Sequence, residues 1–311
     1  MQEIITTAAN MVVSNQELNE YLLEDFTSFI DASKNTVLTY KRGVKQLMVY
    51  LFDNNIKQPT REDIIAFREQ LKTTHKATTV QNYMVAIKLF FKWTNSIGAY
   101  PNIAENLKGA KISRNHKKDY LTSKQVKRLL NCIDTDTLQG KRDYAITLLM
   151  VTGGLRDTEI VNANIEDIRT IGDYTVLYLL GKGRDEKSDY VKLVEQVENA
   201  IIDYLKARGK TNPTEPLFTS LSNHNNNNRL STRSVSRICK NALINAGYNS
   251  ERLTAHSLRH TAITLSLLGG KTLQEAQEFA RHSNIATTQI YAHNLERIKN
   301  NCEETIANAI F

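Results

Sequence analysis

The chain has few cysteines, no long apolar run and no basic leader, and each absence excludes a class of protein. Its three cysteines, Cys132, Cys239 and Cys302, are widely spaced and form no CxxC pair. Such a set argues against a disulfide framework and a zinc site, and it fits a reducing cytosol. No apolar run approaches the roughly 20 residues that cross a membrane, and residues 1–4 lack the basic region of a signal peptide. We therefore expect a cytoplasmic protein without a membrane partner.

The length and the charge distribution predict two domains and a polyanionic partner. A chain of 311 residues with 41% hydrophobic residues has enough material for two cores. The formal net charge is +7, and it is unevenly distributed. Residues 1–118 contain 16 Lys and Arg against 11 Asp and Glu, whereas the remainder contains 24 against 22. A basic excess of this size is compatible with nucleic acid binding without proving it.

The first part of the chain reads as four helices. Apolar residues recur at helical spacing over 18–29, 37–51, 64–71 and 80–94, after a weakly patterned lead-in at 1–15. The pair Thr60 and Asp63 resembles a capping box that opens the third of these helices. The pattern predicts a compact all-α domain over residues 16–108.

A basic, turn-prone stretch follows and separates this domain from the next. Residues 109–119 have lost the helical periodicity, and Thr122 and Gln125 then offer a second capping box. The stretch is either an interdomain linker that crosses phosphates or an ordinary solvated loop.

Beyond this stretch, the pattern of residues 120–311 predicts a mainly α domain with helices over 122–133 and 141–152. A small antiparallel sheet is expected from strands at 174–180 and 190–193, joined by a tight Gly-Lys-Gly turn at 181–183. The fold class is thus mostly α.

The clearest chemical signal lies near the end of the sequence. His256, Arg259 and His260 precede Tyr291 by about 35 positions, and His282 stands nine residues before that tyrosine. Attack on a phosphodiester requires neutralisation of the non-bridging oxygens, which paired guanidinium groups supply. Arg259 and the distant Arg156 are our candidates for that pair, and their stabilisation matters most as charge develops in the transition state.

Tyr291 is a poor nucleophile at neutral pH until a base or a positive field assists it, because an ordinary tyrosine has a pKa of about 10. His256 and His282 are suitable neighbours. The leaving sugar oxygen needs a proton, and Lys182 on the predicted turn is placed to donate it, with Lys187 as the alternative acid. Together these residues predict phosphoryl transfer on DNA through a covalent tyrosine intermediate.

Other interpretations of the same residues stay open. Glu159 either orients the Arg156 guanidinium or makes a simple i,i+3 ion pair. His256 and His260, four residues apart, also match a metal-binding pair on a helix, but no third ligand stands nearby. We therefore expect no metal and no cofactor.

These residues carry a resemblance to a known family. The segment HSLRHTAITLSLLGGKTLQEAQEFARHSNIATTQIYAH over 256–293, VTGGLRDTEI around Arg156 and GKG around Lys182 closely resemble the signatures of the tyrosine recombinases, the phage-integrase and Xer-like family. The resemblance extends over about residues 15–310. It implies a SAM-like core-binding domain at 16–108 and a recombinase catalytic domain at 120–311.

The resemblance also implies a role for each matching position. Arg156 and Arg259 would clamp the scissile phosphate, Lys182 would be the general acid, and His256 a base-like partner. His282 would donate a hydrogen bond to the phosphate, and Tyr291 would form a 3′-phosphotyrosyl bond without metal or ATP.

At the level of the assembly, the family implies a homotetramer on two double-stranded DNA sites, strand exchange through a Holliday junction, and a C-terminal helix inserted into a neighbouring protomer. Here the apolar edge of that helix would comprise Leu295, Ile298, Cys302 and Ile306.

Two positions depart from the family pattern. Gly153 stands where Thr is usual, and Arg281 stands where Gly is usual before the histidine. Arg281 either crowds the turn before His282 or adds a phosphate contact.

DNA-binding candidates outside the catalytic set are polar or basic residues at helix starts and in the linker. They are Lys76, Thr78, Thr79, Gln81, Lys111, Arg114, Lys117, Arg233 and Arg237.

Two rival functions are compatible with much of the same sequence: a DNA-binding protein that has kept the fold without catalysis, and a type IB topoisomerase-like enzyme. The complete catalytic set disfavours the first, and the compact Xer-like size with its amphipathic tail disfavours the second. Whether the chain integrates a mobile element or resolves chromosome dimers is left open by the sequence.

Overall fold

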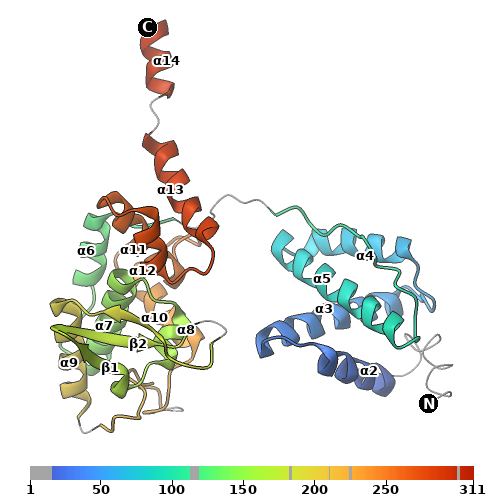
Figure 1. Ribbon diagram of the computed structural model, residues 1–311, viewed down its shortest axis with the longest axis horizontal. Helices are drawn as coiled ribbons and strands as arrows, with labels where there is room; N and C mark the ends of the chain where they lie inside the picture. Colours follow the sequence, from blue (N-terminus) through green and yellow to red (C-terminus); the bar gives the residue numbers. More distant parts are fainter. Residues whose placement is uncertain (1–15, 113–118, 182–183, 210, 224–225, 300–301) are drawn as a thin grey trace. The chain divides into compact units, whose positions relative to one another are not determined.

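The computed structural model describes residues 16–112, 119–181, 184–209, 211–223, 226–299 and 302–311 (Figure 1). The chain divides into two compact units, Met1–Arg114 and Asn115–Phe311. Both are built mainly from helices, and a small antiparallel sheet belongs to the second, which confirms the predicted fold class. No helix in the described ranges is long and apolar enough to cross a membrane.

Over residues 16–112, the described part of the first unit, the chain forms four helices. They are α2 (Gln16–Phe29), α3 (Lys34–Asp53), α4 (Arg61–Thr74) and α5 (Ala77–Ser96). The backbone N–H of Thr60 donates to the Asp63 carboxylate at 2.7 Å, so the predicted capping box starts α4. The core contains aromatic side chains among aliphatic ones: the rings of Phe26 and Phe90 meet edge to face with centroids 5.3 Å apart, in the range that aromatic pairs prefer.

The helices of the second unit surround a central one, α7. In chain order they are α6 (Ser123–Asn131), α7 (Leu138–Gly153), α8 (Asp157–Asn162), the 3₁₀ turn η1 (Ile165–Asp167), α9 (Glu195–Arg208), α10 (Thr232–Asn245), α11 (Ala255–Leu268), α12 (Leu273–Ala280), α13 (Ile285–Lys299) and α14 (Cys302–Ile310). Helix α7 packs against α9, α11, α10 and α6, and its residues 145–151 are all buried. A helix that is apolar on every side belongs in a core, and here it fixes the start of the segment that carries Arg156.

The sheet contains one more strand than the sequence predicted. Its order is β1 (Ile168–Ile171), β2 (Tyr174–Leu179), β3 (Asp189–Lys192), all antiparallel. Strand β1 was missed because it is a short edge strand with largely exposed side chains and no apolar alternation. Leu179 pairs with Asp189, so residues 180–188 connect the strands. Within this connection the Arg184 N–H donates to the Gly181 carbonyl at 3.2 Å, while Lys182 and Gly183, in the middle of the predicted turn, lie outside the described residues.

Candidate active site

The end of helix α7 determines the position of Arg156. Gly154 terminates the helix with φ +59°, in the left-handed region that favours glycine. A Cβ at this position would also lie 3.1 Å from the Phe279 ring. The chain then turns through the fully buried Leu155 and places Arg156 as the N-cap of α8.

The Arg156 guanidinium is held by Glu159 one turn further along α8. Its Nη1 lies 2.6 Å from Glu159 Oε1, and its backbone N–H donates to Oε2 at 2.8 Å. Both interpretations of Glu159 therefore hold, since the i,i+3 ion pair is also what orients the guanidinium. Burial alone would raise the pKa of Glu159, but Arg281 and Arg156 outweigh it and hold the pKa below its usual range.

Arg259 comes from the first turns of α11 and is 1% exposed. Its Nη1 donates to the Gly154 carbonyl and its Nη2 to the Ala280 carbonyl, which joins the ends of α7 and α12. Burial, with the nearby positive charge of Arg156, lowers the pKa of Arg259 to about 9. The guanidinium therefore stays charged at neutral pH.

His282 follows the C-cap of α12, and Thr288 in α13 fixes its ring. His282 Nδ1 and Thr288 Oγ1 are 2.9 Å apart, and Thr288 is fully buried. Burial, reinforced by Arg259, Arg156, Arg281 and His256, lowers the pKa of His282 to about 4. The imidazole is therefore neutral at pH 7, with Nε2 left for a ligand. His256 is exposed in the first turn of α11.

Tyr291 lies on α13, 3% exposed, between two histidine rings. Its ring centroid is 4.5 Å from that of His260 and 6.3 Å from that of His282. Burial raises its pKa, although Arg259 and Arg156 act in the opposite direction. In the DNA-free protein Tyr291 is therefore a neutral phenol within the field of both arginines.

A cleft of about 550 Å³ opens beside Arg156 and His282. It is lined by Arg156, Gly181, Arg184, Asp189, Gln274, Gln277, Glu278, Arg281, His282 and Ser283. Lys182 lies outside the described residues. Lys187, the alternative acid, forms an ion pair with Asp167, a carboxylate that is 3% exposed.

The structure thus brings five of the predicted residues together: Arg156 before α8, His256 and Arg259 on α11, His282 between α12 and α13, and Tyr291 on α13. The sequence did not indicate that Thr288 contacts His282, or that several arginines share the Glu159 carboxylate. Thr288 stands three residues before Tyr291, hence on the same side of α13, and that spacing was the available signal.

The DNA-binding candidates are more dispersed. Arg233 and Arg237 are exposed one turn apart on α10, whose N-cap is Ser231. Lys76 is the exposed N-cap of α5, and Thr78 is exposed in its first turn. Gln81 instead packs on the backbone at Gly109, where an added Cβ would lie 1.8 Å from its Oε1. Lys111 is exposed, whereas Arg114 and Lys117 lie outside the described residues.

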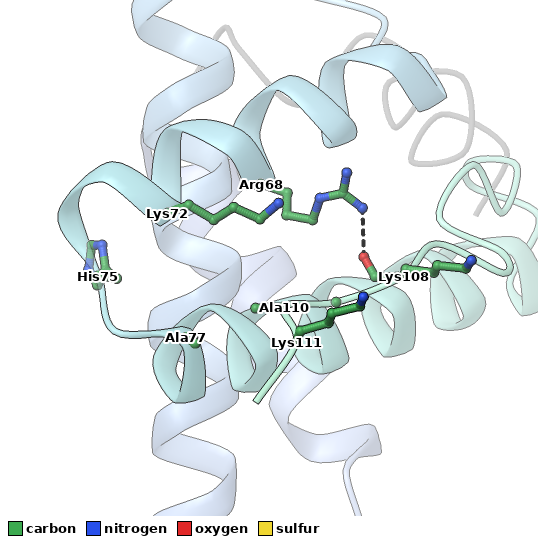
Figure 2. A pocket seen from close by; sticks show the side chains of 8 residues that line it. Arg68, Lys72, His75, Ala77, Lys108, Ala110 and Lys111 are labelled. Atoms are coloured by element: carbon green, nitrogen blue, oxygen red, sulfur yellow. Dashed lines mark hydrogen bonds between the residues drawn. The ribbon is translucent and has the colours of Figure 1, made fainter. Parts of the chain in front are cut away.

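The first unit contains a basic cleft that the sequence did not predict. It occupies about 550 Å³ and is lined by Arg68, Lys72, His75, Ala77, Lys108, Gly109, Ala110 and Lys111. Figure 2 shows the Arg68 guanidinium reaching the Lys108 carbonyl, at a distance of 2.8 Å, with Lys72 and His75 farther along the same side. Glu69 pairs with both Arg68 and Lys72 at 2.8 Å. His75 lines this cleft together with Ala77 and Lys111, a grouping that only the tertiary structure reveals.

Comparisons with known proteins agree with this arrangement. Residues 119–297 match the model of the phage integrase family, and residues 21–96 match the phage integrase N-terminal SAM-like domain. A tyrosine recombinase of Synechococcus elongatus is 26% identical, covering 99% of this chain and 98% of that protein. The tyrosine recombinase XerA of Pyrococcus furiosus is 30% identical, covering 88% and 90%.

Solved structures share the fold at lower identity. A XerH site-specific recombinase bound to palindromic difH substrate, in a post-cleavage complex, has a TM-score of 0.73 and 19% identity, covering 97% of this chain and 94% of that one. A lambda integrase fragment, a dimer bound to a COC′ core site, has a TM-score of 0.66 and 16% identity, covering 86% and 96%.

Proposed function

The chain belongs to the phage integrase family and is therefore a tyrosine-type site-specific DNA recombinase, and we propose that six of its residues break and rejoin the strands: Arg156, Lys182, His256, Arg259, His282 and Tyr291. The observation that carries the proposal is the convergence of two guanidinium groups on Glu159, with the Tyr291 phenol inside their field.

The residues divide the chemistry between them. Arg156 and Arg259 neutralise the scissile phosphate, and the neutral His282 holds a non-bridging oxygen through Nε2. Tyr291 Oη attacks phosphorus, a P–O bond to tyrosine forms, and the bond from phosphorus to the 5′ oxygen breaks. His256 assists removal of the phenol proton, and Lys182 protonates the leaving oxygen.

The product of this step is a 3′-phosphotyrosyl bond and a free 5′-hydroxyl. Because one phosphoester replaces another, the bond energy is retained and rejoining needs no ATP. Attack by the 5′-hydroxyl of a second duplex, in place of the original one, exchanges the strands and leads to a Holliday junction.

Lys182 is favoured over Lys187 as the acid. The Lys187 ammonium is committed to the buried carboxylate of Asp167, and freeing it would leave that charge unpaired. Gly181, the neighbour of Lys182, lines the cleft beside Arg156 and His282.

Double-stranded DNA is the partner, and the basic cleft of the first unit together with Arg233 and Arg237 of α10 supplies phosphate contacts. We further propose that the active assembly is a tetramer on two sites, and that α14 is the helix that each protomer gives to its neighbour. Every residue of α14 is exposed, including Ile306 and Ile310, and so is the terminal Phe311. Leu295, expected on the same apolar edge, is instead 9% exposed in α13, and the side chain of Ile298 lies outside the described residues.

A nicked duplex tests the catalytic proposal. The binding site is first selected from a random-sequence library, and the nick then traps the intermediate by releasing a short strand. We expect wild-type protein to give a covalent adduct on a denaturing gel. Tyr291→Phe is expected to abolish the adduct while leaving the Kd within about twofold, because a single hydroxyl contributes little to an interface dominated by phosphate contacts.

Tyr190→Phe is the matched control, since Tyr190 is 53% exposed on β3 and belongs to neither the cleft nor the arginine set. An adduct that survives Tyr291→Phe would identify another tyrosine as the nucleophile. Tight binding without any wild-type adduct would mean that the fold has been kept for binding alone. Relaxation of supercoiled plasmid that lacks the site would favour the topoisomerase-like alternative.

A further inference from the structure

Arg281 has a backbone conformation that arginine rarely adopts. It is the C-cap of α12 with φ +53° and ψ 45°, in the left-handed region. An L-residue with a Cβ loses conformational free energy there, which is why glycine is usual at helix ends. Residues are kept in such a conformation only when surrounding contacts impose it.

The Arg281 side chain makes those contacts inside the protein. It is 6% exposed, and its Nη1 donates to the Phe279 carbonyl at 2.8 Å. Its Nη2 donates to the Gly154 carbonyl at 3.0 Å and to Glu159 Oε2, also at 3.0 Å. Both terminal nitrogens therefore face protein acceptors, and Nε is enclosed as well. A phosphate in the cleft would have to displace these bonds, which disfavours the phosphate contact.

The same acceptors serve the two catalytic arginines. Gly154 O accepts from Arg259 as well as from Arg281, and Glu159 is bonded to Arg156 and lies 3.9 Å from Arg259. The Arg281 carbonyl itself accepts from Arg156 Nη2 at 3.2 Å. Residue 281 thus joins the end of α7, the start of α8 and the end of α12, and His282 is its chain neighbour.

We propose that Arg281 is a positioning residue for strand cleavage: it holds Glu159 and the carbonyl of Gly154 so that Arg156, Arg259 and His282 meet the phosphate in one fixed geometry. The inference rests on the proposed active site. A planar fork suits this task because it donates to several acceptors at fixed angles, which an ammonium group does not.

Single-turnover cleavage of the nicked duplex, with protein saturating, tests the role. Arg281→Gly restores the family's usual residue and relieves the backbone, so loss of folding is not expected. We expect adduct formation to slow by about 10- to 100-fold, the scale set by misplaced catalytic groups, while the Kd stays within about twofold. Arg281→Lys is expected to fall between Gly and wild type.

Lys271→Ala is the matched control. It removes one positive charge at the other end of α12, where Lys271 pairs with Glu275 on the surface. An Arg281→Gly protein with wild-type cleavage would overturn the proposal. A fall in DNA affinity by the same factor as the cleavage rate would also overturn it, because Arg281 would then be a DNA contact.

A second readout needs no DNA. His282 faces Arg259, Arg156, Arg281 and His256, with the Tyr291 ring beside it. Loss of the Arg281 charge is expected to raise the pKa of His282 from about 4. An NMR titration measures this pKa, and the histidine signal that is missing in His282→Gln assigns the resonance. An unmoved pKa would contradict the placement of Arg281. If wild type forms no adduct, the active-site proposal fails, whereas this titration still tests Arg281.

Discussion

Glu159 places a buried negative charge in the site that we propose binds phosphate. Three guanidinium groups, those of Arg156, Arg259 and Arg281, lie within 4 Å of its oxygens. Without a counter-ion their mutual repulsion and desolvation would oppose packing them together. The carboxylate allows the three guanidinium groups to pack together before DNA binds. Because one negative charge faces three positive charges, the site stays positive and still attracts an anion.

The lowered pKa of His282 predicts how stability depends on pH. The unfolded histidine has a pKa of about 6.5, whereas the folded one has a pKa of about 4. Between these values the unfolded state binds the proton and the folded state does not. The free energy of unfolding therefore falls as the pH is lowered from about 6.5 to about 4, and this contribution changes no further below that range.

Urea unfolding of wild type and His282→Gln at pH 7 and pH 5 measures the effect. We expect wild type to lose on the order of 1 kcal/mol more than the variant, after allowance for partial solvent screening. Equal losses in the two proteins would contradict the buried, neutral imidazole.

At this scale the sequence suggested candidate reactive groups but not the bonds between them. Arg156, Arg259, His282 and Tyr291 could be proposed as candidates because phosphoryl transfer restricts the residue types that can perform it. Glu159 and Arg281 are 122 positions apart, and no local pattern links such residues. Their contact depends on where α7 and α12 end, which only tertiary packing determines.

Elements were predictable where local chemistry fixes their ends. Thr122 N–H donates to Gln125 Oε1 at 2.8 Å, so the second predicted capping box starts α6 as expected. Helix α7, in contrast, begins at Leu138, three residues earlier than its apolar pattern suggested. Its N-cap is Thr137, whose hydroxyl accepts from Gly140 N–H at 3.0 Å. A single capping threonine before a polar first turn is a weak signal in sequence.

The basic cleft between α4 and the segment after α5 yields a prediction about DNA affinity. Neutralising Lys72 and Lys111 together, as Lys72→Gln/Lys111→Gln, removes two cations that line it. We expect the slope of log Kd against log salt to fall by about 2, since each phosphate contact contributes about 0.9. Cleavage at saturating protein should be unchanged, because the chemistry lies in the other unit.

Fluorescence anisotropy between 50 and 300 mM salt measures the slope. Lys34→Gln/Lys57→Gln is the control, because it removes the same charge from exposed positions of the first unit that do not line the cleft. Identical slopes for the two double variants would mean that the cleft makes no phosphate contact.

At the scale of the whole molecule, most of the excess positive charge and the proposed catalytic arginines lie in different units. Residues 1–118 carry most of the positive excess, 16 Lys and Arg against 11 Asp and Glu, whereas the arginines proposed to be catalytic belong to the second unit. The predicted linker 109–119 spans the point where the chain divides, between Arg114 and Asn115. The domain boundaries themselves stay a prediction, since composition marks a change of character more reliably than a residue.

Helix α14 carries the prediction for the assembly. Its Ile306 is 58% exposed, Ile310 is 68% exposed and none of its residues is buried, so it adds little to the fold of its own chain. Deleting residues 302–311 is therefore expected to shift the Tm by no more than about 2 °C. Binding to one DNA site should be retained within about twofold, whereas complexes of four protomers on two sites should fall by at least about tenfold, because an apolar helix inserted in trans contributes buried area to every interface.

Sedimentation of the protein with two-site DNA measures this. The double variant Ile306→Asp/Ile310→Asp keeps the length of the helix and should reproduce the deletion, because a charge cannot enter an apolar groove unpaired. A large drop in Tm on deletion would show instead that α14 packs on its own chain. Normal tetramers from both variants would mean that another surface joins the protomers.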